Sequence, residues 1–274
     1  MASRKQQKEQ ARAQRLEQER EAAARTQRNR RYQLFGGVIV AAVVIIGVAI
    51  AISSGGNNNS ATGLLKGHDA TKTYSQVNQL LAGIPQSGTT LGNPKAPVTM
   101  TYFGDLECPI CKDFTLSIFP QFVQDQVRTG KVKVTYRSFC TATCNNTTTS
   151  DPQQLFEKQQ VAAYAAGKQN LFWDYTELFY HEQGTEDTGY VTTDYLDQLA
   201  KQIPGLNLSK WQTDLGDPAL LAQVQGDLHA ASAQNLDGTP TLIMSGAKGS
   251  EQVQGSGGTL PDYSNLAAAV RAVQ

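Results

Sequence analysis

Residues 98–114, VTMTYFGDLECPICKDF, constrain the fold more than any other stretch of this 274-residue chain. The first six are rich in β-branched and aromatic side chains, which is typical of a buried strand. Gly104 and Asp105 end that run, and the CPIC sequence of residues 108–111 follows. Proline is accepted in the first turn of a helix, where its missing N–H leaves no bond unmade. The stretch therefore predicts a strand, a CxxC motif and a helix in direct succession.

Two cysteines separated by two residues form a redox pair, a structural disulfide or half of a zinc site. The predicted helix places Cys108 at its N-terminus, where unpaired backbone N–H groups and the helix dipole stabilise a thiolate. Cys111 lies one turn further along, close enough to attack a mixed disulfide formed on Cys108. This context favours the redox pair over the structural bridge and the zinc site.

Residues 34–52, LFGGVIVAAVVIIGVAIAI, carry no charged side chain. A helix of 19 residues nearly spans a hydrocarbon core of about 30 Å. Residues 1–33 hold ten lysines and arginines against four glutamates, and the next basic residue is Lys66. The positive-inside rule therefore predicts a cytoplasmic basic tail (1–33), one transmembrane helix (34–52) and an extracytoplasmic remainder in the cell membrane. A cleaved signal peptide is the alternative, which the long basic region and weak cleavage site disfavour.

The formal net charge is zero, and beyond residue 33 the acidic residues outnumber the basic ones, so we expect no nucleic-acid binding. Residues 53–88, beginning SSGGNNNSAT, predict an extracytoplasmic linker in which 74–81 form a short helix. All four cysteines follow the membrane segment. An even cysteine count in an oxidising compartment fits disulfide chemistry.

Residues 131–139, KVKVTYRSF, alternate in polarity and predict a second strand, parallel to the first through a right-handed crossover. Cys140 and Cys144 follow directly. A bridge between them would close a tiny loop and contribute roughly 2 kcal/mol in the chain-entropy model. We favour this structural disulfide. A second redox pair that relays electrons from the first, and a four-cysteine zinc site, remain the alternatives.

The rest of the chain predicts helices followed by a strand hairpin. Residues from about 151 to 236 are helical in character, with Asp217 and Pro218 as the N-cap and first residue of one helix. The sequence GTPTLIM (238–244) predicts a strand that Pro240 can begin, since the first residue needs no ladder N–H. No glycine-rich phosphate loop or acidic cluster is present, and the three histidines have no catalytic spacing. We expect no metal and no cofactor.

The strand–CPIC–helix order, the helical insertion, and the final Thr-Pro strand, hairpin and helix resemble the thioredoxin fold. The runs LGNPKAPVTMTYFGDLECPICKDF and GTPTLIM are similar to the DsbA-like thiol:disulfide oxidoreductases, in particular the membrane-anchored forms of Gram-positive bacteria. The resemblance covers about residues 91–273. It implies an α/β thioredoxin-fold domain (89–274) with an inserted helical subdomain (about 151–236), preceded by the single transmembrane helix.

The resemblance also implies roles for individual residues. Cys108 would be the attacking, more exposed thiol and Cys111 the buried resolving thiol. Pro240 would be a cis-proline facing the pair, and Thr239 would offer backbone hydrogen bonds to an extended substrate chain. Residues expected to tune the Cys108 thiolate are Pro109, Ile110 and Glu107.

Two positions depart from the family pattern. Ile110 stands where strongly oxidising members carry histidine, which implies a less stabilised thiolate. Tyr102 stands where many thioredoxin-fold enzymes keep a buried carboxylate, so proton transfer from Cys111 would use Asp105, Glu107 or water.

The function implied is the introduction of disulfides into unfolded exported proteins with free thiols. A membrane quinone-linked partner would reoxidise the pair. The alternatives are a reductase or isomerase of the same fold, and a non-catalytic binding module in which CPIC is a structural disulfide.

Overall fold

A computed structural model describes residues 68–255 and 260–274. The basic tail, the apolar segment 34–52 and residues 53–67 of the expected linker lie outside these residues. Within the part described, no helix combines the length and apolar character that crossing a membrane demands.

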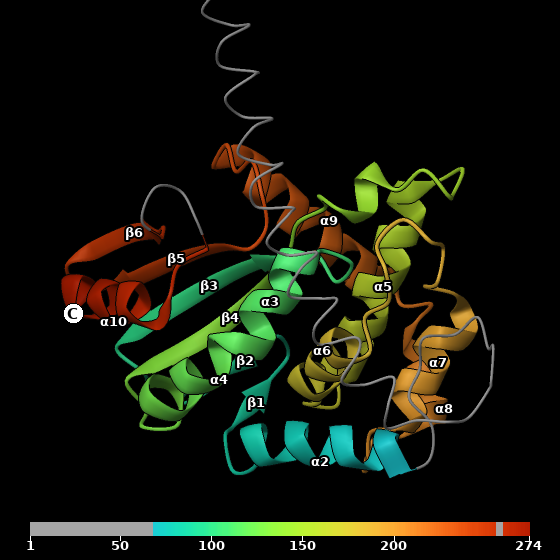
Figure 1. The fold of residues 1–274 in the computed structure, drawn as a ribbon, viewed down its shortest axis with the longest axis horizontal. Helices are drawn as coiled ribbons and strands as arrows, with labels where there is room; N and C mark the ends of the chain where they lie inside the picture. Colours follow the sequence, from blue (N-terminus) through green and yellow to red (C-terminus); the bar gives the residue numbers. More distant parts are fainter. Residues whose placement is uncertain (1–67, 256–259) are drawn as a thin grey trace, which may run out of the picture. The chain divides into compact units, whose positions relative to one another are not determined.

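A six-stranded mixed sheet forms the centre of the fold (Figure 1). The predicted parallel pair is confirmed: β3 (Val98–Gly104) runs parallel to β4 (Val132–Ser138). On its other side β3 pairs antiparallel with β5 (Thr241–Gly246). The strand order is β1-β2-β4-β3-β5-β6, in which the remaining strands are β1 (Gln86–Ser87), β2 (Thr90–Leu91) and β6 (Gly249–Val253).

Because β3 is central, one of its faces is fully enclosed, while Thr99 and Thr101 on the other face are half-buried. Val98, Met100 and Tyr102 are fully buried, as the apolar run predicts. The strand ends at Gly104, where a Cβ atom would lie only 2.7 Å from the Tyr136 ring and 3.0 Å from the Tyr102 ring. Glycine thus lets the end of the strand pack directly under two tyrosines.

Phe114, Ile118, Phe119 and Phe122 recur at spacings of three and four, which predicts one helix with an apolar face after the CPIC motif. The helix observed there is shorter. Helix α3 (Pro109–Ser117) stops at Ile118, and α4 (Phe119–Phe122) continues into a single π-helical turn, Val123–Val127. Pro120 explains the break, because it has no N–H to continue the helical ladder and its ring crowds the preceding turn. The predicted apolar face is nevertheless buried, including Phe114 and Phe119.

The helical insertion is present as five helices, and Figure 1 shows them to one side of the sheet. Asp217 caps the last of them by accepting a hydrogen bond from the Ala219 N–H, with Pro218 at the first position, as predicted. The closing helix α10 (Tyr263–Val273) packs on the β5–β6 hairpin. The five inserted helices are α5 (Pro152–Gly167), α6 (Phe172–His181), α7 (Thr193–Lys201), α8 (Leu208–Asp214) and α9 (Pro218–Ala233).

Folded structure starts earlier than residue 89, the expected domain boundary. Helix α2 (His68–Leu81) packs against α6, within the range expected to be a linker. Asp174 of α6 accepts hydrogen bonds from the Tyr74 hydroxyl (3.2 Å) and the Gln86 side-chain amide (2.7 Å). Polar contacts with distant residues therefore hold α2 on the folded domain, although the local sequence predicted only a short helix there.

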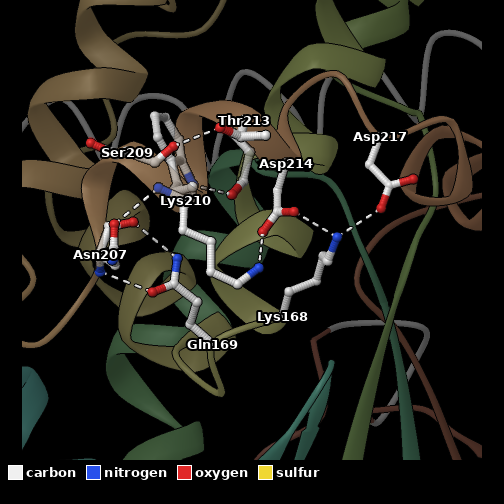
Figure 2. Close-up of polar contacts among 10 residues, drawn as sticks. Lys168, Gln169, Asn207, Ser209, Lys210, Thr213, Asp214 and Asp217 are labelled. Atoms are coloured by element: carbon white, nitrogen blue, oxygen red, sulfur yellow. Dashed lines mark hydrogen bonds and ion pairs between the residues drawn. The ribbon is translucent and has the colours of Figure 1, made fainter.

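A polar cluster joins the end of α5 to α8 and α9 (Figure 2). The Lys168 ammonium lies 2.6 Å from the Asp214 carboxylate and 2.7 Å from that of Asp217. Lys210 approaches Asp214 from the other side, at 2.7 Å. The Gln169 side-chain amide meets the backbone of Asn207, which caps α8. These contacts hold α5, α8 and α9 together at their polar ends.

We predict that Phe119→Ala lowers the free energy of unfolding by about 3–5 kcal/mol, the usual cost of emptying a buried phenylalanine site. Phe119 is fully buried and stacks on Trp173 of α6, with ring centroids 5.3 Å apart. It therefore links the helix pair that follows CPIC to the insertion. Guanidinium denaturation measures the change, and Lys248→Gln at an exposed position is the control. A loss below about 1 kcal/mol would contradict this packing.

Candidate active site

Cys108 lies at the junction of strand and helix, where the sequence predicted it. It is the N-cap residue of α3, in extended conformation, and its carbonyl accepts a hydrogen bond from the Lys112 N–H (3.1 Å). Pro109 occupies the first helical position. Both CPIC thiols are free, and Cys108 is 5% exposed whereas Cys111 is fully enclosed.

The environments of the two thiols separate their acidities. A hydrogen bond with the Cys111 side chain is the largest cause that lowers the pKa of Cys108, to about 7. The Thr239 side chain and the Cys111 backbone N–H lower it further, while burial and the Asp105 charge act in the opposite direction. Burial, and then Cys108 itself, raise the pKa of Cys111 well above its ordinary value. One thiol is therefore prepared to ionise and its neighbour to stay protonated.

The segment before β5 faces this pair. The Thr239–Pro240 peptide bond is cis, and the Cys108 thiol donates a hydrogen bond to the Thr239 carbonyl (3.4 Å). Ile110 is 47% exposed, the one large apolar side chain so exposed among the described residues. A surface groove beside it is lined by Ile110, Thr239, Pro240, Gln252, Val253 and Leu260, among others.

Of the residues expected at the site, Glu107 is bonded away from the thiols. Its carboxyl is buried and accepts a hydrogen bond from the Gln159 side chain of α5 (3.0 Å). Burial raises the pKa of Glu107. The other expected residues, from Cys108 to Cys111 together with Thr239 and Pro240, lie around the pair or the groove.

Asp105 has a role that the sequence did not reveal. Its buried carboxylate accepts four hydrogen bonds, from the Thr141 N–H (2.9 Å), the Thr143 N–H (2.9 Å), the Thr143 hydroxyl and the Glu107 N–H (3.1 Å). Burial raises its pKa against the effect of these bonds. The hydrogen bond from Glu107, two residues further along the chain, forms a common aspartate turn, which a local sequence pattern can predict. No local pattern predicts the hydrogen bonds from Thr141 and Thr143.

Cys140 and Cys144 form a disulfide, with their Cα atoms 5.6 Å apart. The loop that it closes lies against the candidate site, because the hydroxyls of Thr141 and Thr239 share a hydrogen bond of 2.5 Å. The second cysteine pair is thus next to the first in space, although more than 30 residues separate Cys108 from Cys140 in sequence.

Two further residues, Tyr102 and Gln183, hold the CPIC loop in place, and the sequence did not single out Gln183. Gln183, just after α6, donates from its side-chain amide to the carbonyls of Leu106 (2.6 Å) and Cys108 (3.2 Å). The hydroxyl of Tyr102 shares a hydrogen bond with the Thr115 hydroxyl (3.2 Å). Burial raises the pKa of Tyr102, so the phenol stays protonated. Across the described ranges, no three His, Cys, Asp or Glu side chains gather as a metal site requires.

Comparisons with known proteins agree with this geometry. A family model described as Thioredoxin matches residues 86–256. Disulfide bond formation protein D of Bacillus subtilis (strain 168) is 27% identical over 178 residues, which is 62% of this chain and 73% of that protein. The probable disulfide bond formation protein D of Bacillus anthracis is 23% identical over 57% of this chain and 69% of its own.

Among solved structures, oxidised BdbD from Bacillus subtilis has the same fold, with a TM-score of 0.56 and 23% identity over 68% of this chain and 94% of that one. Since the matched family model covers more than half of the residues, the assignment does not depend on the structural likeness. The chain belongs to the thioredoxin family, as a DsbA-like thiol:disulfide oxidoreductase.

Proposed function

We propose that this protein introduces disulfides into unfolded exported proteins through Cys108 and Cys111, on the extracytoplasmic side of the cell membrane. The observation that carries the proposal is the separation of the two thiol pKa values at the start of α3, opposite cis-Pro240. A structural bridge has no need of one thiol with a pKa near 7.

In the proposed mechanism the oxidised pair is the reagent. A substrate thiolate attacks the Cys108 sulfur of the Cys108–Cys111 bond, and Cys111 leaves with the bonding electrons and takes up a proton. The substrate's second thiol, as its thiolate, then attacks the substrate sulfur of the mixed disulfide, and Cys108 leaves as a thiolate. Two electrons have passed from two substrate thiols to the enzyme pair. A leaving thiol of low pKa makes the last step favourable.

The groove beside the pair would hold the substrate chain. In the dithiol form the Thr239 carbonyl accepts from the Cys108 S–H. The disulfide form has no S–H, so we propose that this carbonyl is then free to accept a backbone N–H of the substrate, alongside Pro240. Pro109 and Ile110 would tune the thiolate from the helix start, and Glu107 would act only through its buried charge.

Anchoring and reoxidation rest on the sequence and on the relatives. We propose that residues 34–52 span the membrane, with residues 1–33 in the cytoplasm, and that a quinone-linked membrane partner returns the pair to its oxidised state. The relatives' name, disulfide bond formation protein D, is consistent with the oxidising direction. Ile110, in place of the histidine of strongly oxidising members, favours reduction or isomerisation as the second candidate function.

The first prediction from the proposed function concerns pH. Because only the thiolate reacts, the rate at which iodoacetamide modifies Cys108 in the reduced protein should rise with pH to a plateau, with a midpoint near 7. Cys111 should remain unmodified over the same range, since burial keeps it protonated. Peptide mass spectrometry distinguishes the two. A Cys108 midpoint at about 8.5, the value of a free cysteine, would contradict the proposed activation.

The second prediction concerns direction. The reduction potential of the Cys108–Cys111 pair, measured against glutathione, should lie at about −120 to −180 mV, the range of oxidases and isomerases. The protein should then oxidise a reduced, unfolded substrate in stoichiometric amounts, and Cys108→Ser should abolish this. A potential at or below about −270 mV would exclude the oxidase and favour a reductase or a structural bridge.

The third prediction concerns location. In a bacterial host the full chain should stay in the membrane fraction at alkaline pH, and a chain lacking residues 34–52 should not. Thiols introduced at exposed positions such as Lys248 should react with a membrane-impermeant reagent in intact cells. Protection of Lys248→Cys from that reagent would place the domain in the cytoplasm instead.

A further inference from the structure

The 140–144 loop reaches the active site through one residue, Thr141. Its hydroxyl is hydrogen-bonded to the hydroxyl of Thr239, 98 residues away in sequence. Thr239 in turn accepts a hydrogen bond from the Cys108 thiol through its carbonyl. A single residue therefore stands between the disulfide loop and the sulfur that reacts in the proposed function.

The loop is closed on itself by a disulfide and is fastened to the protein by two other residues. The Cys140–Cys144 bond closes it, and the Asp105 carboxylate binds the backbone N–H groups of Thr141 and Thr143. Gln159 of α5 donates to the Thr143 hydroxyl (3.3 Å) as well as to Glu107. Asp105 and Glu107 precede Cys108 directly in the chain, so the loop is bonded to the same segment that presents the thiol.

We propose that Thr141 is a positioning residue of the active site, and that the Cys140–Cys144 disulfide serves to present it. By bonding the Thr239 hydroxyl, Thr141 keeps that side chain beside the Cys108–Cys111 pair. The proposal rests on the proposed function in one respect, namely that Cys108 is the reacting thiol.

The hydrogen-bonding capacity of two paired hydroxyls explains how Thr141 would affect the pKa of Cys108. Each hydroxyl has one proton to donate and two lone pairs to accept with. When Thr141 donates to Thr239, the Thr239 proton is left for a sulfur, and the hydrogen bond of the Thr239 side chain lowers the pKa of Cys108. Without Thr141, the Thr239 side chain is free to turn to another rotamer. The other titratable groups acting on Cys108 are Cys111 and Asp105, and Asp105 opposes the thiolate.

The test compares Thr141→Val, which keeps the shape and removes the hydroxyl, with Thr141→Ser, which keeps the hydroxyl. The rate of Cys108 alkylation is measured against pH in the full chain. The Cys108–Cys111 pair is reduced for this measurement, and peptide mass spectrometry verifies that the Cys140–Cys144 disulfide is intact. We expect the pKa of Cys108 to rise from about 7 to about 7.5 or more in Thr141→Val, a roughly twofold loss of thiolate at pH 7. Thr141→Ser should stay near the original value.

A second set of variants tests the role of the bridge. Cys140→Ser with Cys144→Ser should raise the pKa of Cys108 in the same direction. Adding Thr141→Val to this double variant should not raise the pKa of Cys108 further, because both changes act through the same contact. If Thr141→Val does not fold, Thr141→Ala removes the same hydroxyl with a smaller side chain and should give the same rise.

Three results would overturn the inference. They are an unchanged pKa of Cys108 in Thr141→Val, an equal shift in Thr141→Ser, and fully additive shifts from the bridge and from Thr141. Failure of the proposed function would look different: its marks are a Cys108 midpoint near 8.5 in the unmodified chain, or a potential at or below about −270 mV. The pKa comparison among variants does not depend on whether the enzyme oxidises or reduces its substrates.

Discussion

The active site depends on hydrogen bonds made by one sulfur at the first turn of α3. Cys108 is the N-cap residue, so its side chain stands where backbone N–H groups have no helical partner. The Cys111 N–H is among the groups that lower its pKa. The surrounding segments keep the start of α3 in this place. The strand before it, the segment of Thr239 opposite it and the loop beside it are all fixed by other contacts.

The central strand provides the rigid part of this arrangement. β3 is hydrogen-bonded on both sides, and its last residues before the CPIC motif, Tyr102 and Phe103, are fully buried, so the point at which the chain leaves the sheet is fixed. β5 pairs beside it, with Thr241 opposite Phe103, and this register brings Thr239 and Pro240 next to the CPIC motif. The inserted helices reach the same point from outside, because Gln183 after α6 and Gln159 of α5 bond the loop that carries Cys108.

Asp105 shows how a buried carboxyl group can organise the loops around a site. Its carboxylate has no ion-pair partner among the described residues, and its four hydrogen bonds all come from loop groups nearby. A buried carboxylate is tolerated only when such bonds replace water. These bonds draw the 140–144 loop onto the segment before Cys108. The sequence placed Asp105 among candidate proton acceptors, which stays a prediction, and the structure shows in addition that its oxygen atoms hold a loop.

The sequence by itself determined what depends on neighbours along the chain. Strand, CPIC and helix start follow from β-branched residues, a glycine break and a proline at the first helical position. The Asp217–Pro218 helix start and the β5–β6 hairpin follow for the same reason. Pro120 carried a local signal that the apolar spacing concealed, so the helix break at Ile118 was missed.

Only the tertiary structure decided which distant groups meet. Thr141 and Thr239, or Asp174 with Tyr74 and Gln86, are bonded across some 90 to 100 residues, and no local pattern marks such pairs. A hydroxyl or carboxylate finds its partner after the apolar core has set the distance between segments, because hydrogen bonds act over about 3 Å. The identity of the reacting cysteines is therefore legible in the sequence, and the groups that position them are not.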